Sequence, residues 1–292
     1  MKKMKKLLAL VTVLVMGAAL MVGCGKDNKE SGTKGAASGD KEWAEDVQKI
    51  VDRGVLHVGV KNAVVGFGYQ DPLTNEYSGL EITLAEKIAE YLGVEVEFTA
   101  VTAATRTELI DSGDLDCVLA TFTITDERKE SWDFSTPYFT DHVTVLVENS
   151  SGITKLADLV DKKVAVSSGS TSARALVSAM IEGGVISGDN FNADTFDPST
   201  WTEGISFQQY DDYPTISTAL SAGTVDAFCV DKSILAIYNT DGRSYIEDQF
   251  SPQDYGVATA KDSDFSAVVD ELITGWLADG TIESLITENN LN

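Results

Sequence analysis

Strand-like and helix-like patterns alternate along most of this 292-residue chain, and this alternation restricts its fold more than any other feature. Apolar residues recur at helical spacing over residues 80–92. A strand pattern at 94–98, a helix pattern at 105–112 and an apolar strand from Asp116 follow. This order predicts an α/β fold with a largely parallel sheet. Ligands of such sheets bind beyond the carboxyl ends of the strands, so the residues after each strand are the first candidates for a site.

The residues that follow this last strand carry groups that bind anions. The sequence TFTITDER, from Thr121 to Arg128, changes abruptly from a strand pattern to a helix start, with Thr125 or Asp126 as the N-cap. Thr121 and Thr123 can supply hydroxyl or backbone donors, and Arg128 offers a planar fork for a carboxylate. Taken alone, these residues fit a solvated arginine at a helix start equally well.

An internal repeat adds a second half to this site. Twice along the chain a helix pattern ends at glycine, and an apolar residue and an aspartate then lead into a strand. Aligning the two aspartates, Asp116 and Asp226, sets Thr121 opposite Asp231. One strand therefore ends in anion-binding groups and its counterpart ends in a carboxylate. Two similar lobes that face each other in this way would hold both ends of a zwitterion.

The charge of the chain excludes several classes of partner. Acidic residues outnumber basic ones by 46 to 22, and the formal charge is −24. Removal of residues 1–23, which carry four lysines and no acid, takes the charge to −28. Such acidity disfavours nucleic acid and anionic membrane surfaces as partners. It also makes a group of cations at one place in the chain more informative.

The N-terminus has the pattern of an export signal. Four lysines precede an apolar run over residues 7–22, and the run ends at Met21-Val22-Gly23-Cys24. This end resembles a bacterial lipobox, although Met21 stands where leucine is usual, and it predicts a signal peptide over 1–23 with lipid on Cys24. An uncleaved membrane anchor is the alternative, but the run is short for a span. Residues 24–41 are expected to form a flexible tether, which places the protein on the outer face of the membrane.

The remaining cysteines and the two histidines argue against metal and redox chemistry. Cys117 and Cys229 lie in apolar strand patterns, so buried free thiols are favoured over a disulfide. With only His57 and His142, neither a zinc motif nor a catalytic triad can be assembled. The small-residue loop at 167–172 lacks the spacing of a Walker loop. We therefore expect no metal and no cofactor.

Four sequence motifs together resemble a known family. They are Gly79-Leu-Glu-Ile, TFTITDERK from Thr121, DFSTPY from Asp133, and Val225-Asp-Ala. The sequence resembles the exported solute-binding proteins of ABC importers for polar amino acids, extracellular solute-binding protein family 3, over nearly all of residues 45–285. The resemblance implies a two-lobed α/β fold, periplasmic-binding-protein-like and of type II, with a two-segment hinge. The implied segments are lobe 1 at 42–137 and 256–292, lobe 2 at 143–250, and the hinge at 138–142 and 251–255.

The same resemblance implies how a free amino acid would be held. Arg128 and Thr123 would bind its α-carboxylate, with help from backbone amides near Ser170 and Thr171. Asp231 would bind its α-ammonium group. The implied partner is an ABC transporter permease, and the implied state is a monomer.

Further residues resemble the aspartate/glutamate-binding branch. Val64 and Thr102 stand where aromatic rings often clamp the ligand. An arginine in the place of Arg106 holds the side-chain carboxylate in that branch, and residues in the places of Lys61 and Tyr213 assist. The alternatives are a surface residue for Arg106, a solvated loop lysine for Lys61 and packing for Tyr213.

The expected function is therefore capture of glutamate or aspartate, with glutamine or another polar amino acid as the alternative. An enzyme of the dehydratase type on the same fold would need a poised general acid, and Asp231 is already assigned to the ammonium group. A ligand-binding domain of a receptor is the third class. No apolar span or signalling domain follows the last lobe in the sequence, which disfavours that class.

Overall fold

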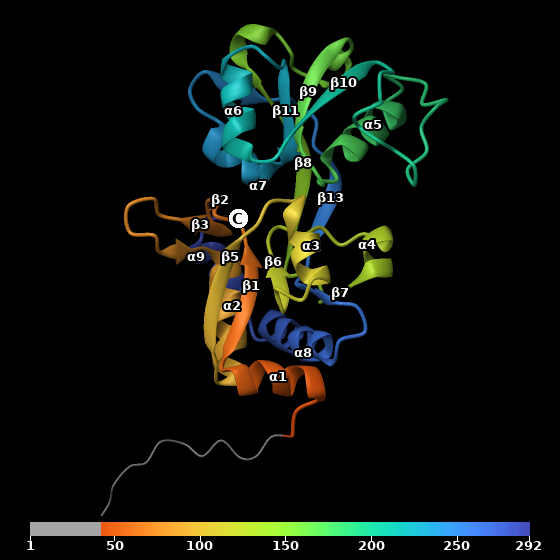
Figure 1. The fold of residues 1–292 in the computed structure, drawn as a ribbon. Coiled ribbons are helices and arrows are strands. Elements are labelled where there is room, and N and C mark those ends of the chain that lie inside the picture. Colours follow the sequence, from red (N-terminus) through yellow and green to blue (C-terminus); the bar gives the residue numbers. More distant parts are fainter. Residues whose placement is uncertain (1–41) are drawn as a thin grey trace, which may run out of the picture. The chain divides into compact units, whose positions relative to one another are not determined.

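The computed structural model describes residues 42–292, and two β-sheets form the centres of two lobes within them (Figure 1). The signal peptide, tether and lipidated Cys24 expected from the sequence lie outside the described residues. In the first sheet three strands are parallel, and the last two run antiparallel to their neighbours. Its order is β5 (Glu95–Ala100), β1 (Val55–Val60), β6 (Cys117–Leu119), β14 (Ala258–Ala260) and β7 (Trp132–Phe134).

Helices cover both faces of this first sheet. Because successive strand residues point to opposite faces, Cys117 and Leu119 of β6 join the core under α2 (Leu80–Leu92), whereas Val118 joins the core under α3 (Thr105–Asp111). The lobe is completed by α1 (Glu45–Arg53), α4 (Asp126–Ser131), α8 (Asp264–Ala278), α9 (Thr281–Glu288) and a small sheet of β2 (Ala63–Val64), β3 (Gly68–Gln70) and β4 (Tyr77–Ser78).

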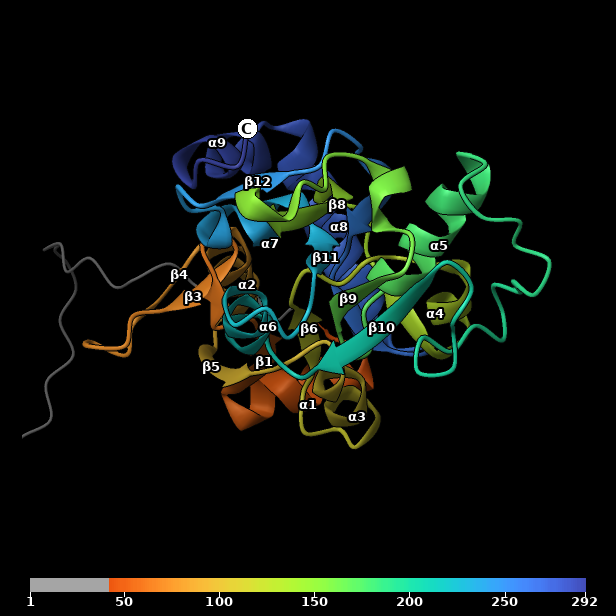
Figure 2. The ribbon, with the colours of Figure 1, turned by 90° about the horizontal axis from the view of Figure 1, so that it is seen from above.

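The second sheet also lies between helices. Val164 and Val166 of β9 pack with α5 (Ser172–Glu182), and Ala165 joins the core that contains α6 (Tyr213–Ser221). The two helices accordingly lie on opposite sides of the sheet (Figures 1 and 2). The strand order is β10 (Ile205–Tyr210), β9 (Lys162–Ser167), β11 (Ala227–Asp231), β8 (Phe139–Glu148) and β12 (Arg243–Tyr245), with β13 (Phe250–Tyr255) paired to β8. Short helical segments are η1 (Asn149–Ser151), η2 (Leu156–Leu159), α7 (Lys232–Leu235) and η3 (Ala236–Tyr238).

The sequence repeat corresponds to a repeated hydrogen-bond arrangement. Asp116 accepts a bond from the His57 amide at 2.8 Å and returns one from its own amide to the His57 carbonyl at 2.9 Å. Asp226 makes the same pair of bonds with Lys163, at 2.8 and 2.9 Å. Each aspartate thus fixes its strand to the neighbouring parallel strand. The two strands then end at equivalent points of the two lobes, as the alignment predicts.

Strands β8 and β13 run side by side between the lobes (Figure 1). They pair antiparallel, with Phe139 opposite Tyr255. The register shifts between Phe250 and Pro252, around Ser251, whose φ is +50°. Phe67 of the first lobe packs edge-on against the Phe139 and Tyr255 rings, at centroid distances of 5.0 and 5.7 Å. An aromatic cluster therefore covers the junction of the lobes.

Residues 187–207 are polar and rich in Gly, Asp and Asn, a composition that predicts a surface excursion. Residues 187–204 form a largely exposed loop, but residues 205–207 belong to β10, and aromatic rings anchor the loop. Phe191 and Phe196 contact Trp201 at centroid distances of 6.0 and 5.6 Å, and all three join the core under α5. Three rings are enough to anchor this polar loop because each ring buries a large apolar surface.

Two other expectations, the two-lobed architecture and the free thiols, are confirmed. The α/β architecture with two lobes is present, and Cys117 and Cys229 are buried free thiols. No helix within residues 42–292 is both long and apolar enough to cross a membrane.

Candidate functional site

The residues selected from the sequence gather where strands of both lobes end. Lys61 follows β1, Thr121 follows β6, and Asp231 is the last residue of β11. Six of the nine expected ligand contacts are buried, at 2–6% exposure: Lys61, Arg106, Thr121, Thr123, Tyr213 and Asp231. The other three, Arg128, Ser170 and Thr171, are half-buried.

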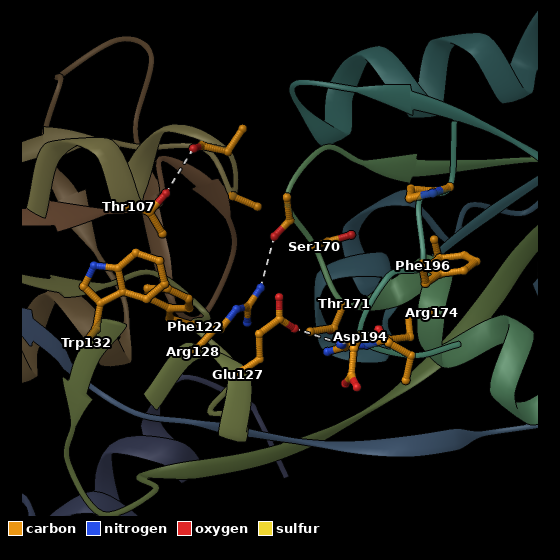
Figure 3. A pocket seen from close by; sticks show the side chains of 16 residues that line it. Thr107, Phe122, Glu127, Arg128, Trp132, Ser170, Thr171, Arg174, Asp194 and Phe196 are labelled. Atoms are coloured by element: carbon orange, nitrogen blue, oxygen red, sulfur yellow. Dashed lines mark hydrogen bonds and ion pairs between the residues drawn. The ribbon is translucent and has the colours of Figure 1, made fainter. Parts of the chain in front are cut away.

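Arg128 occupies the junction of the lobes. Thr125 caps α4 by accepting a hydrogen bond from the Arg128 amide at 3.1 Å, which fixes the start of the helix. The Arg128 guanidinium donates from Nη1 to the Thr123 carbonyl at 2.7 Å and from Nη2 to the Gly169 carbonyl of the second lobe at 3.0 Å. Figure 3 shows this side chain pointing at the loop that carries Ser170, beside a cavity of about 320 Å³. Burial lowers the pKa of Arg128 to about 9, and nearby Arg106 adds to this effect.

The two lobes are in direct contact beside Arg128. Gly169 has a φ of +73°, and a Cβ there would lie 2.8 Å from the Ala103 carbonyl oxygen of the first lobe. Only glycine fits this approach without displacement. An ion pair between Glu127 and Arg174 at 2.9 Å joins the lobes at the outer edge of the same cavity (Figure 3).

Gln253, which the sequence did not indicate as a site residue, links two of the expected ligand contacts, Thr123 and Thr171. Gln253 of β13 is 2% exposed, and its Oε1 accepts hydrogen bonds from Thr123 Oγ1 at 2.9 Å and Thr171 Oγ1 at 2.6 Å. The two threonines belong to different lobes. Strand alternation gives a signal for this position, because Gln253 shares its face with the buried Tyr255.

Asp231 provides a buried carboxylate on the opposite wall. Its Oδ2 accepts a hydrogen bond from the Tyr255 hydroxyl. Burial raises the pKa of Asp231 to about 7, and the neighbouring Asp141 contributes to the rise, whereas Arg106 and Arg128 oppose it. The cations of the first lobe therefore act electrostatically on the carboxylate of the second.

Two further cations of the first lobe, Arg106 and Lys61, are buried. Arg106 Nη1 donates to the carbonyls of Ala120 and Thr121 at 2.8 and 3.1 Å, and its guanidinium stacks 3.7 Å from the centre of the Phe122 ring. The Lys61 ammonium lies 5.5 Å from the centre of the Tyr213 ring. Neither cation is a solvated surface group. The buried Tyr213 ring packs against Lys61, so packing and a place at the candidate site are compatible for this residue.

Burial and mutual repulsion destabilise the charged forms of these cations. Burial lowers the pKa of Arg106 to about 10. Burial also lowers the pKa of Lys61 well below its ordinary value, and the charge of Arg106 lowers it further. The Arg106 Nε has no hydrogen-bond partner among the described residues. An anion at this position would stabilise both charged groups.

Glu81 belongs to the Gly79-Leu-Glu-Ile motif but was given no role from the sequence, and it lies close to these cations. It is fully buried in the first turn of α2, and its Oε1 accepts bonds from the Thr121 amide and the Tyr138 hydroxyl, both at 2.6 Å. These bonds hold Thr121 at a φ of +45°. Burial raises the pKa of Glu81, against the opposing effects of Tyr138, Thr121 and Lys61. An acid on the apolar face of a helix is the signal that could have identified it.

Thr121 and Ser170 are the two remaining residues among the expected ligand contacts. The Thr121 hydroxyl donates to the Ala120 carbonyl at 2.9 Å. Ser170 precedes α5, with its Oγ buried and without a hydrogen-bond partner in the described part of the chain. Amides at a helix start favour anions. No cluster of His, Cys, Asp and Glu within residues 42–292 could hold a metal ion.

Two α/β lobes with cations on one wall and a carboxylate on the other define a two-lobed, periplasmic-binding-protein-like solute-binding protein. Residues 56–289 match the family model of the bacterial extracellular solute-binding proteins, family 3, and the chain belongs to this family. This confirms the family expected from the sequence.

Individual relatives differ in the ligand they are named for. A glutamine-binding protein of Geobacillus stearothermophilus is 31% identical over 268 residues, which cover 88% of this chain and 92% of the relative. A glutamate-binding protein of Corynebacterium efficiens is 27% identical over 271 residues, 87% of this chain and 84% of the relative. A Streptococcus pneumoniae amino acid ABC transporter substrate-binding protein, solved bound to L-arginine, has a TM-score of 0.69 and 26% identity, covering 83% of this chain and 97% of that chain.

Proposed function

We propose that this protein captures an acidic amino acid, glutamate or aspartate, between its lobes and delivers it to an ABC importer. The observation that carries the proposal is the burial of two neighbouring cations, Lys61 and Arg106, within the first lobe. Buried like charges are costly unless an anion compensates them. A side-chain carboxylate of the ligand is such an anion, and it accepts the paired donors of a guanidinium well.

The α-groups of the ligand would lie between the remaining charges. Arg128, with the hydroxyls of Thr123 and Thr171, supplies donors for the α-carboxylate, and Asp231 supplies the countercharge for the α-ammonium group. Binding of both groups would hold the lobes together. The proposed hinge is the pair of segments at 138–142 and 251–255, where β8 and β13 pass between the sheets.

Glutamine is the second candidate, and Glu81 favours it. A neutral ligand would not leave Arg106 without a countercharge, because Glu81 is buried close enough to stabilise the charged forms of both Lys61 and Arg106. The 31% identity to a glutamine-binding protein points the same way. A preference for an acidic ligand therefore depends on how much of the positive charge of Lys61 and Arg106 is left uncompensated by Glu81.

Replacing Arg106 with glutamine separates these two candidates. In the wild type we expect glutamate or aspartate to bind at least tenfold more tightly than glutamine, a difference of about 1.4 kcal/mol. Arg106→Gln should narrow or reverse this ratio, because the guanidinium that favours a carboxylate is lost while the α-group contacts remain. Calorimetry with glutamate, aspartate, glutamine and arginine measures the ratio.

Arg53→Gln is the matched control, since Arg53 precedes β1 and lies at the opposite end of that strand from Lys61. It should leave the ratio unchanged. A wild type that prefers glutamine or arginine, or an Arg106→Gln variant with an unaltered ratio, would contradict the acidic ligand.

We also propose that lipid on Cys24 anchors the protein to the outer face of the membrane. The support is the charged, apolar and small-residue pattern that ends at this cysteine. Cys24→Ser should release the protein into the medium or the soluble envelope fraction, because the lipid supplies the membrane affinity. Cell fractionation measures the release. Retention of the serine variant in the membrane after cleavage of the signal segment would show that lipid is not the anchor.

A further inference from the structure

The side-chain amide of Gln253 joins three parts of the protein. Its oxygen bonds to Thr123 of the first lobe and Thr171 of the second, and its nitrogen bonds within β13. We propose that Gln253 is a positioning residue that couples binding of the ligand's α-carboxylate to the conformation of the hinge strand. This inference rests on the proposed function, because it assumes that Thr123 and Thr171 meet a carboxylate.

The orientation of the amide is determined by its surroundings in β13. Gln253 Nε2 lies 2.9 Å from the Ser251 carbonyl, 3.1 Å from Ser251 Oγ and 3.2 Å from the Pro252 carbonyl. Carbonyl oxygens only accept hydrogen bonds, so the nitrogen must face them. The amide oxygen then faces the two threonine hydroxyls, and both must act as donors toward it.

In this arrangement the threonine hydroxyls that a ligand carboxylate would need as donors already donate to Gln253. A threonine hydroxyl has one proton to donate, and Thr123 and Thr171 both direct theirs at Gln253. A ligand carboxylate that takes these protons leaves the buried amide oxygen without a donor, which is unfavourable. Rotation of the amide by half a turn resolves the conflict, since its NH₂ group can donate to both hydroxyl oxygens.

The rotated amide would disturb the hinge strand. Its oxygen would then face the carbonyl oxygens of Ser251 and Pro252, which repel it, and the Ser251 hydroxyl could offset only part of this repulsion by donating one hydrogen bond. These two residues lie at the register shift between β8 and β13, where Ser251 has a positive φ. The backbone there would have to rearrange to relieve the repulsion. Capture of the α-carboxylate would thereby change the strand pair that connects the lobes.

Two substitutions of Gln253 distinguish a role in coupling ligand binding to the hinge strand from a role in supporting the fold alone. Gln253→Glu is buried beside the Ser251 and Pro252 carbonyls, so it should carry a proton on the oxygen that faces them. Its other oxygen still accepts from both hydroxyls, but after rotation the group could donate to only one of them. This variant should therefore hold the lobes together and resist the ligand. Gln253→Met fills similar space and releases both hydroxyls, so it should loosen the lobes and leave their protons available to the ligand. Gln209→Glu, on the exposed side of β10, controls for the added charge.

Calorimetry with the amino acid that binds most tightly measures the affinity of each variant, and small-angle X-ray scattering measures its radius of gyration. We expect Gln253→Met to bind at least tenfold more tightly than Gln253→Glu, and to have the larger radius of gyration before ligand is added. A charge effect on the ligand alone would not change that radius. Equal affinities of the two variants, or equal radii, would overturn the coupling. A wild type that binds no amino acid would instead overturn the proposed function, and the coupling with it.

Discussion

Replacing Arg128 with alanine is expected to weaken amino acid binding by about 30-fold or more while the protein still folds. Loss of one partner from a buried charge pair costs on the order of 2–5 kcal/mol, which corresponds to at least that factor in Kd. The Arg128 guanidinium is held by carbonyls of both lobes, so its removal also loses a contact between the lobes. Calorimetry gives the affinity, and thermal unfolding shows whether the variant is folded.

Arg174→Ala is the matched control for this substitution. Arg174 lines the same cavity and joins the lobes through Glu127, whose side chain is 69% exposed. Exposed pairs contribute about 0–1 kcal/mol, so the change in Kd should be fivefold or less by the same conversion. If Arg128→Ala binds as tightly as Arg174→Ala, the assignment of Arg128 to the α-carboxylate is wrong.

The second large effect concerns Asp231 and depends on pH. Its pKa in this structure is about 7, which means that the carboxylate is about 90% ionised at pH 8 and about 1% ionised at pH 5. Only the ionised form attracts an α-ammonium group, which stays protonated over this range. Affinity should therefore fall by about 100-fold from pH 8 to pH 5, with most of the loss below pH 7.

Asp231→Asn should bind about 30-fold or more weakly at pH 8, because the ammonium group loses its countercharge. The variant should also lose the decline below pH 7. Asp211→Asn, an exposed position just before α6, serves as the control and should keep the wild-type profile. Calorimetry at several pH values provides the profiles. A decline that persists in Asp231→Asn would assign the titration to another group.

The positions at strand ends could be predicted because they depend on short sequence patterns. The strand that leads to Thr121 and the strand that ends at Asp231 are each specified by apolar runs, glycines and a repeated aspartate within a dozen residues. Both walls of the site follow from that local information. The burial of Lys61 and Arg106 could not be decided in the same way, because a cation beside a strand or at a helix start can equally face water.

The roles of Glu81 and Gln253 could not be predicted because their partners are distant in the sequence. Thr121 lies 40 residues from Glu81, and Thr123 lies 130 residues from Gln253. Nothing near either residue specifies those contacts. They form only when the sheet brings α2 to β6 and when β13 returns between the lobes. A buried polar residue on an otherwise apolar face can suggest that such a partner exists, but it does not identify the partner.

The two core cysteines have a practical consequence for measuring movement of the lobes. Cys117 lies in the first sheet and Cys229 in the second, and both are fully buried. Burial raises the pKa of both thiols well above the ordinary value, which keeps them in the unreactive protonated form. A cysteine introduced on the surface of each lobe would therefore react selectively with a fluorescent or spin label in a protein that begins after Cys24. Distances between such labels would test whether the lobes move relative to each other when ligand is added, without removal of either native thiol.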